Sequence, residues 1–543
     1  MSELVGFTAE QPEQLYEAFV GAFGEEQRPF FALASAPGRL ELAGNHTDHQ
    51  GGCVISAALA QRTVGFAAIN NTDIVNVEMG EFGRVGIDLS GDLQPVEEEK
   101  GTSAALVRGM LAKAKKRGVV PGFDMVVSSE IPVGAGVSSS AAFEVMLGSI
   151  IGAIGSGCAV TDPDTDYVSA MEPLDLATEA VEVEHEYFGK GCGAQDQIAS
   201  AFGGVVYIDF SPASPEQPIV MPVDLNFEKF QFTPLLIDSR LDHSAYNDQY
   251  DAVPGDMFAV AKYFGKERLV DVPREEFNDR YDEVVGALGE LPALRAKHFF
   301  EETARVKKQK VALETREWKS FAQGMIACCN SQQQQLKNVT PVVDFDENTD
   351  EEFKKQINMP QKIVDICAKL LTGWGGWRVH GGGFGGHIMA LCPNDIVKQF
   401  TDETNRRITD TMFPTGDNRV ERAYIDHNGA TAYIIPGTAF APATEEASAQ
   451  ELEATGISGI PEKEPEEERF VPTSAVTRAQ VLSDAAAYAT HMAEVAAKKA
   501  AESNDPKAAY DARVAAIAAA QAARSATDGS VDVKVAKYDS KNQ

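Results

Sequence analysis

The chain has 543 residues, 44% of them hydrophobic, and 81 acidic residues against 48 Lys and Arg give a formal net charge of −33. This length allows more than one domain with a large core. The acidic balance argues against general binding to nucleic acid or to an anionic membrane. The seven cysteines are odd in number and lack CxxC spacing, which suggests neither a disulfide framework nor a zinc site.

The N-terminal segment, with Glu3, Glu10 and Glu13, lacks the basic start of a signal peptide. No apolar run is expected to reach the length that spans a bilayer. We therefore expect a cytoplasmic protein without a membrane or nucleic-acid partner.

Hydrophobic patterning predicts an α+β or mixed α/β protein with two lobes. The predicted elements, in chain order, are a strand at 31–36, a buried strand or turn at 53–60, a helix at 103–116, a strand at 123–127, helices at 141–154 and 176–188, strands at 204–210 and 232–238, and helices at 299–317 and 361–371. We assign residues 1–210 to an N-terminal lobe and 211–436 to a C-terminal lobe. Residues 437–543 pass from an acidic, proline-containing run to an alanine-rich segment, which predicts a linker and a weakly ordered tail.

Three unusual segments interrupt these elements. Residues 36–52, APGRLELAGNHTDHQGG, gather an arginine, an asparagine, two histidines and acidic residues in a short span. Residues 131–144, IPVGAGVSSSAAFE, place a glycine-serine loop directly before a helix, where backbone amides bind phosphate. Alone, this loop is also compatible with an ordinary strand-to-helix turn with a serine N-cap.

The third segment, WGGWRVHGGGFGG at 374–386, is too rich in glycine for a regular helix or strand interior. A flexible linker has a similar composition. However, the apolar run at 387–392 that follows is typical of a strand entering a core. We therefore expect the backbone here to press closely against another group.

These segments resemble, in the same order, the motifs of the galactokinase branch of the superfamily that includes homoserine, mevalonate and phosphomevalonate kinases (the GHMP kinases). The family motifs read roughly GR-NLIGEHTD-N-G, P-G-GLSSSA and GGGFGG. Residues 184–197, EHEYFGKGCGAQDQ, also resemble the family's EH…CG-MDQ stretch. The resemblance, which covers residues 31–437, implies a two-lobed α+β fold with the active site between the lobes. It also implies an enzyme that transfers the γ-phosphoryl group of ATP to the C1 hydroxyl of galactose.

The resemblance assigns catalytic roles residue by residue. Asp196 corresponds to the aspartate that accepts the proton of the C1 hydroxyl, and Arg39 to the arginine that pairs with it. Ser140 and Glu184 would hold Mg²⁺, which prefers a few hard oxygen ligands. The phosphates of ATP would be wrapped by Gly134, Ala135, Gly136, Val137, Ser138, Ser139 and Ser140.

The sugar-binding pattern of the family departs from this sequence at several positions. The pattern maps onto Asn45, His46, Thr47, Asp48, Gly193 and Tyr246. The family glutamate of GEHTD is Asn45 here, the glutamate before the tyrosine is Ala245, and Asp248 and Gln249 replace arginines that often follow it. Specificity is therefore less firmly predicted than the type of reaction.

Three alternatives stand beside a galactokinase, and the first comes from these departures. Loss of the negative charge at Asn45 removes the repulsion that would exclude a C6 carboxylate, so a kinase for galacturonate or another galactose-like sugar is a second hypothesis. Some galactokinase-like proteins are sugar sensors without catalysis, but they lose residues from the serine-rich loop. Phosphorylation of mevalonate or homoserine is disfavoured, because those branches lack the GxHTDxxGG element. We expect a monomer or a weak homo-oligomer.

Overall fold

The computed structural model describes residues 4–25, 28–132, 136–161, 164–225, 227, 229, 231–346, 349–412 and 418–440, except 212–217. The chain divides into a compact unit, Met1–Pro442, and a second unit, Ala443–Gln543, which lies outside the described residues. The compact unit continues past the boundary predicted at 436. Phe440 lies beyond that boundary, yet its ring stacks on Tyr16 with centroids 4.6 Å apart.

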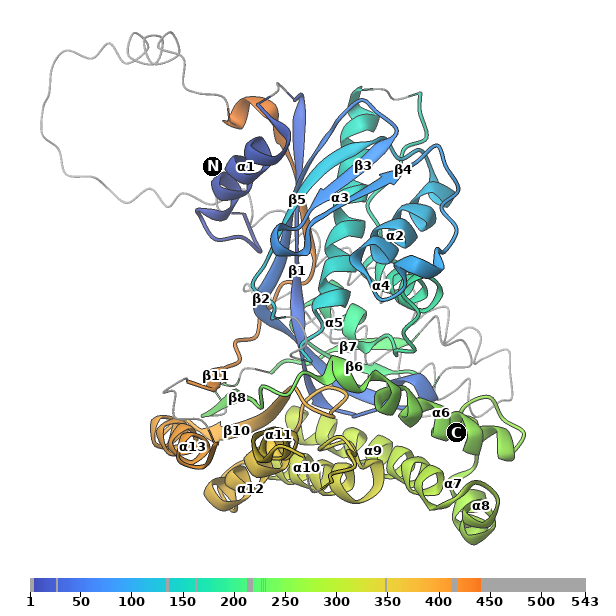
Figure 1. Cartoon of the computed structure of the whole chain (residues 1–543), viewed down its shortest axis with the longest axis vertical. Helices are drawn as coiled ribbons and strands as arrows, with labels where there is room; N and C mark the ends of the chain where they lie inside the picture. Colours follow the sequence, from blue (N-terminus) through green and yellow to red (C-terminus); the bar gives the residue numbers. More distant parts are fainter. Residues whose placement is uncertain are drawn as a thin grey trace, which may run out of the picture. The chain divides into compact units, whose positions relative to one another are not determined.

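An eight-stranded sheet is built around one long strand, β1 (Phe30–Ala43), in the upper part of Figure 1. Neighbouring strands of this sheet are antiparallel to each other, except β3 and β5, which are parallel. The order is β12-β1-β2-β5-β3-β4, with β6 paired to β2 and to β7. The further strands are β2 (Cys53–Ile69), β3 (Ile74–Glu78), β4 (Arg84–Asp88), β5 (Phe123–Ser129), β6 (Val205–Asp209), β7 (Ile219–Pro222) and β12 (Thr431–Pro436). Strands β7 and β12 come from beyond residue 210, so the sheet takes in segments of the predicted C-terminal lobe.

Helices cover both faces of this sheet because alternate residues of β1 point to opposite sides. Phe31 and Leu33 face α1 (Gln11–Phe23), whereas Ala32 and Ala34 face the helices on the other side. The small alanine side chains allow α3, whose contacts run along β1 and β2, to lie close to the sheet. The helices on that side are α2 (Ser103–Arg117), α3 (Ser139–Thr161), α4 (Pro173–Val183) and α5 (Gln195–Phe202).

A second, four-stranded antiparallel sheet has the order β11-β8-β10-β9. Helices α9, α10, α12 and α13 pack around it, and α6 to α8 pack against α9, in the lower part of Figure 1. The strands are β8 (Phe232–Asp238), β9 (Gly376–Val379), β10 (His387–Pro393) and β11 (Val420–Arg422). The helices are α6 (Asn247–Tyr263), α7 (Arg274–Asp279), α8 (Tyr281–Leu288), α9 (Glu290–Glu314), α10 (Trp318–Ser331), α11 (Glu351–Ile357), α12 (Met359–Leu371) and α13 (Val397–Met412).

Two sequence-based expectations are wrong in detail. The glycine-rich segment contains a strand, β9, because Gly376–Val379 pairs with β10 while only the residues after it are irregular. The chain also contains an apolar helical stretch long enough to span a bilayer, Ser139–Ala159 in α3. Because 83% of that window is buried inside the protein, the stretch serves as a core helix.

The boundary at Pro442 makes a prediction about truncation. A chain ending at Pro442 keeps every contact of the compact unit and should match the urea unfolding curve of the full chain. A chain ending at Ala430 loses β12, which pairs with β1 from Ser35↔Thr431 to Phe30↔Pro436, and the contact of the partly buried Phe440 ring with Tyr16. We expect it to be at least about 3 kcal/mol less stable. Equal loss of stability in both truncated chains would contradict this boundary.

Candidate active site

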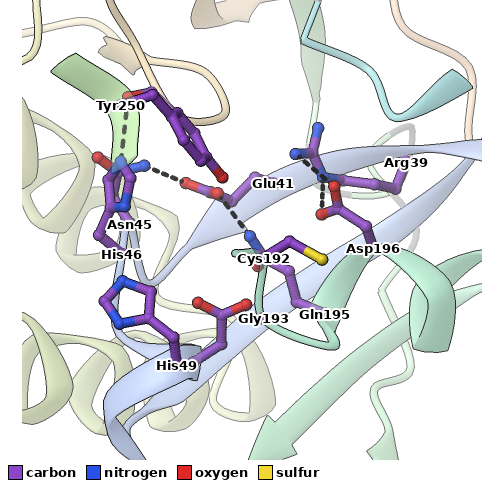
Figure 2. A pocket seen from close by; sticks show the side chains of 12 residues that line it. Arg39, Glu41, Asn45, His46, His49, Cys192, Gly193, Gln195, Asp196 and Tyr250 are labelled. Atoms are coloured by element: carbon purple, nitrogen blue, oxygen red, sulfur yellow. Dashed lines mark hydrogen bonds and ion pairs between the residues drawn. The ribbon is translucent and has the colours of Figure 1, made fainter. Parts of the chain in front are cut away.

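A polar pocket of about 340 Å³ lies where β1, the turn after it, the segment before α5, helix α6 and the loop after β9 meet (Figure 2). The residues that line it are mostly polar or charged, which suits a small polar molecule. The lining residues are Arg39, Glu41, Asn45, His46, Asp48, His49, Cys192, Gly193, Gln195, Asp196, Tyr250 and Gly382. Four segments far apart in the sequence therefore meet at one site.

Arg39 and Asp196, predicted as a catalytic pair, are in contact at the wall of this pocket (Figure 2). Arg39 Nε lies 2.6 Å from Asp196 Oδ1 and Arg39 Nη2 lies 3.2 Å from Oδ2, a two-pronged arrangement that fixes the carboxylate. Burial favours loss of the arginine's charge, but the carboxylates of Asp196 and Glu41 raise the pKa of Arg39. The arginine is only 5% exposed and lines this pocket, so its positive charge acts on groups inside the pocket.

The serine loop reaches the same carboxylate. Ser138 Oγ donates a hydrogen bond to Asp196 Oδ2, and Arg39 Nη1 donates one to the carbonyl of Gly136. Ser138 has a left-handed backbone, with φ of 64°, which is uncommon for a residue with a side chain. This loop was expected to bind phosphate, and it is joined directly to the predicted catalytic base.

Glu41 is a second buried carboxylate at the pocket, and the sequence motifs assign it no role. It follows Arg39 by two residues on β1, so both side chains lie on one face of the strand. Glu41 Oε1 accepts a hydrogen bond from Arg378 Nη2 on β9, and Oε2 accepts one from Gln195 Nε2 at 2.8 Å. Burial opposes ionisation, but the guanidinium groups of Arg378 and Arg39 hold the pKa of Glu41 below its usual value.

Asn45 lines the pocket, yet protein groups already use its whole amide. Its Nδ2 donates to Glu41 Oε1 at 3.0 Å and to the carbonyl of Gly381 at 2.6 Å. Its Oδ1 accepts from Gln332 Nε2 at 2.9 Å and from Asn338 Nδ2 at 3.0 Å. An amide has two donor hydrogens and two acceptor lone pairs. A ligand can therefore bond to Asn45 only by displacing a protein partner.

The two residues after Asn45 have different surroundings. The His46 ring lies in the pocket, where its Nε2 is 3.0 Å from the carbonyl of Gly382, and burial lowers its pKa. Thr47 is fully buried and does not line the pocket. Its hydroxyl donates to the carbonyls of Gly44 at 3.0 Å and Cys53 at 2.9 Å. Thr47, predicted as a sugar-binding residue, therefore holds the turn between β1 and β2.

Asp48 and Gly193 face each other so closely that only glycine fits. A Cβ atom at Gly193 would lie 1.8 Å from Asp48 Oδ2. Burial, followed by the negative charge of Asp196, raises the pKa of Asp48 to about 7. Within the described part of the chain Asp48 forms no ion pair, and the backbone N–H groups of His49 and Gln195 that donate to it only partly offset the rise in its pKa. A carboxyl group without a cation can also accept hydrogen bonds from hydroxyl groups.

The structure places Tyr250, not the predicted Tyr246, in the pocket. Both belong to the same short stretch, and the family pattern maps onto the first of the two. Tyr246 is half-buried against the apolar cluster of α6 and α9. The Tyr250 ring lies 5.3 Å from the His46 ring and packs so tightly on Gly382 that a Cβ there would be 2.0 Å from Tyr250 Cε2.

The serine loop, which is predicted to bind phosphate, leads into α3, a 23-residue helix that begins at Ser139. Gly134 and Ala135 lie outside the described residues, and Val137 is buried with its carbonyl accepting a hydrogen bond from Arg39 N at 3.1 Å. Ser139 and Ser140 stand in the first turn, where free backbone amides and the helix dipole attract anions. This end of α3 is therefore suited to hold phosphate beside the pocket.

Ser140 and Glu184, the predicted magnesium ligands, are in contact, with Oγ to Oε1 at 2.7 Å. Glu184 also accepts hydrogen bonds from Lys190 Nζ at 3.2 Å, Cys192 Sγ at 2.8 Å and Gln197 Nε2 at 2.8 Å. Although burial opposes its ionisation, the charge of Lys190 and these hydrogen bonds lower the pKa of Glu184 to about 2. The carboxylate is therefore charged at neutral pH.

This oxygen pair fits Mg²⁺, which keeps several waters and shares phosphate oxygens. Across the described part of the chain, no group of three or more His, Cys, Asp and Glu side chains is arranged to hold a metal. Glu144, one turn along α3 from Ser140, is buried beside Glu184 with its Oε1 unpartnered. Burial and the charge of Glu184 raise the pKa of Glu144 well above its usual value. Two carboxyl groups therefore lie close together beside the serine loop, and a bound cation would reduce the repulsion between them.

The similarities to known proteins cover the segments that build this site. Residues 17–69 match the galactokinase galactose-binding signature, and residues 105–204 match the N-terminal domain of the GHMP kinases. The structure is similar to that of galactokinase from Lactococcus lactis complexed with galactose, with 22% identity, 78% of this chain and 99% of that chain covered, and a TM-score of 0.62. It is also similar to mevalonate kinase from Methanococcus jannaschii, with 15% identity, 72% and 98% covered, and a TM-score of 0.44. The predicted α+β fold of this superfamily is confirmed.

The buried ion pair makes a prediction about stability. Replacing Arg378 by Met leaves the Glu41 carboxylate buried without its cation, which typically costs about 3–5 kcal/mol. Urea unfolding at pH 7 measures this loss. The double variant Arg378→Met, Glu41→Gln removes the unpaired charge and should recover part of it. A loss below about 1 kcal/mol in the single variant would contradict the role given to the pair.

Asp48 makes a prediction about pH. Its pKa of about 7 lies above the ordinary value of 3.8, so the folded state binds a proton more tightly than the unfolded state. The contribution of Asp48 to the free energy of unfolding is therefore fully present below pH 4. It is lost as pH rises to 7, by at most about 1.4 kcal/mol per pH unit. Asp48→Asn should gain stability relative to wild type over this window in urea unfolding. A pH-independent difference would contradict the raised pKa.

Proposed function

We propose that this chain, which belongs to the GHMP kinases and carries the galactose-binding signature of the galactokinases, transfers the γ-phosphoryl group of ATP to the C1 hydroxyl of galactose. The observation that supports this reaction most directly is the contact between Arg39 and Asp196, 2.6 Å apart at the pocket wall. Because Ser138 bonds to the same aspartate, the sugar pocket and the serine loop adjoin at one carboxylate.

Asp196 is the proposed base of the reaction. It accepts the proton of the C1 hydroxyl as the oxygen attacks the γ-phosphorus, so that a C1–oxygen–phosphorus link forms and the bond to the β-phosphate oxygen breaks, releasing ADP. Arg39 holds the carboxylate in a fixed orientation before the transfer through two hydrogen bonds. As the transfer proceeds, its positive charge also stabilises the developing negative charge.

The nucleotide is proposed to bind along the serine loop. Residues 134–140 would surround its phosphates, and the first turn of α3 would offer backbone amides. Ser140 and Glu184 would hold Mg²⁺, which when bound neutralises charge on the phosphate oxygens. Lys190, next to Glu184, adds a cation in a chain that otherwise carries a large negative charge.

The sugar is proposed to lie between Asp48, His46 and Tyr250. Asp48 would accept hydrogen bonds from hydroxyl groups, with Gly193 leaving room for its carboxylate. Asn45 would act through Glu41, because all of its own hydrogen-bonding groups are already used. In this arrangement Asn45 positions the wall of the pocket and does not itself contact the sugar.

Glu41 favours galactose over galacturonate. The family motif has asparagine at position 41 and glutamate at position 45, whereas this chain has the two residues exchanged. The negative charge is therefore kept within 3.0 Å of Asn45 and was not lost from the pocket. A C6 carboxylate would add a negative charge to a pocket that Glu41, Asp48 and Asp196 already line.

A catalytic role also agrees better with the site than a sensor role. A sensor needs only the sugar pocket, whereas here Ser138 contacts Asp196 and Ser140 contacts Glu184. These are contacts between the proposed phosphate side and the proposed catalytic and metal side. We further propose a cytoplasmic enzyme that is a monomer or weak homo-oligomer, with its seven cysteines present as free thiols.

Asp196→Asn tests the proposed base. Asparagine keeps the shape and a hydrogen-bond acceptor but cannot take up the proton, so kcat should fall by about 10²–10⁴-fold. ADP release is measured with ATP, Mg²⁺ and, in turn, galactose, galacturonate, arabinose, glucose and N-acetylgalactosamine. Wild type should release ADP with galactose and not with galacturonate.

Galactose binding in the absence of nucleotide is the control, because Asp196→Asn should still bind the sugar within about tenfold of wild type. Turnover by the variant close to that of wild type would exclude Asp196 as the base. Turnover of galacturonate in preference to galactose would overturn the argument from Glu41.

A further inference from the structure

His49 is the pocket residue whose polar groups the protein leaves unused. Both of its ring nitrogens are buried and have no hydrogen-bond partner among the residues that the structure describes, whereas Glu41, Asn45 and His46 all have partners. Leaving a buried polar group unsatisfied is unfavourable, so such groups usually mark a place for a ligand or an ordered water. The ring lines the pocket, so a molecule bound there can supply the missing partner.

The ring is held in place by its surroundings. It packs edge-on against His46, with centroids 5.8 Å apart, and lies 6.2 Å from the Phe258 ring of α6. It belongs to a short 3₁₀ turn, Asp48–Gln50, which is pinned because Gln50 Oε1 accepts a hydrogen bond from Leu269 N at 3.0 Å. The nitrogens are therefore positioned before a ligand arrives, which favours selective binding.

The chemistry of this ring suits a hydroxyl group. Burial, followed by the charges of His46 and His298, lowers the pKa of His49 well below its usual value, so the ring is neutral at ordinary pH. A neutral imidazole offers one N–H donor and one acceptor nitrogen. A hydroxyl also combines a donor with acceptors, so either nitrogen can pair with it.

The position of His49 indicates which part of the sugar it meets. Figure 2 shows His49 at the side of the pocket away from Arg39 and Asp196. In the proposed reaction the C1 hydroxyl lies at Asp196. We propose that His49 is a specificity-determining residue that hydrogen-bonds one sugar hydroxyl remote from C1, at C3, C4 or C6. This inference rests on the proposed function, because that function sets the orientation of the sugar.

His49→Phe tests the inference, because phenylalanine keeps an aromatic ring against His46 but removes both nitrogens. Phe258→Leu is the matched control, which alters the packing around His49 and leaves its nitrogens. Calorimetric titration with galactose and its 2-, 3-, 4- and 6-deoxy derivatives measures binding without nucleotide. Steady-state assays give kcat and KM for each.

We expect His49→Phe to bind galactose about 5- to 50-fold more weakly than wild type, with kcat at saturation within about threefold. The difference between the two proteins should disappear for one of the 3-, 4- and 6-deoxy sugars and persist for 2-deoxygalactose. Phe258→Leu should bind galactose within about threefold of wild type. This pattern identifies the hydroxyl that His49 contacts.

Two results would overturn the inference. One is galactose binding by folded His49→Phe within twofold of wild type, and the other is an equal loss for every sugar, which would indicate packing alone. Failure of the proposed function is separately visible. If the wild-type protein binds galactose but releases no ADP, the proposed kinase activity is wrong, and the binding of wild type and His49→Phe can still be compared. If the wild-type protein binds none of these sugars, both the proposed function and the inference about His49 are wrong.

Discussion

The ion pair between Glu41 and Arg378 is the interaction on which the site depends. Both side chains are almost completely buried, and they join β1 of the larger sheet to β9 of the smaller one. Taking two charges out of water is costly, so the pair is tolerable only because hydrogen bonds complete it. Gln195 and Asn45 supply those bonds to Glu41, and this ties the residue before Asp196 to the same network. The position of the proposed base is thus coupled to the contact between the two sheets.

Strand β1 also positions two of the charged side chains of the pocket. Arg39 and Glu41 lie two residues apart on β1 and pair with opposite charges from other elements, Asp196 and Arg378. Asp48 has no oppositely charged partner in the described part of the chain, and its raised pKa reflects burial near Asp196 and Glu41. A neutral polyhydroxyl ligand can donate hydrogen bonds to these carboxylates without adding negative charge. An anionic sugar would add to the repulsion, which is the physical basis for choosing galactose.

Sequence patterns predicted the elements and the approximate site, but not how the side chains share their hydrogen bonds. Apolar periodicity located α2 and α12 within two residues, and the motifs brought Arg39, Asp196 and Asp48 to one pocket. The sequence does not show that every hydrogen-bonding group of the Asn45 amide is already used, because three of its four partners lie more than 280 residues away in the chain. Tyr250 was missed because two tyrosines lie one helical turn apart, and spacing alone does not tell which one faces the pocket. The role of Glu41 required its pairing with Arg378.

The position of the new phosphate ester on the sugar tests the central claim most directly. Wild-type protein is incubated with galactose, ATP and Mg²⁺, and the product is examined by proton–phosphorus correlation NMR. If Asp196 activates the C1 hydroxyl beside the serine loop, the phosphorus couples to the proton on C1. Coupling to the C6 protons, or ATP hydrolysis without a phosphosugar, would contradict the account.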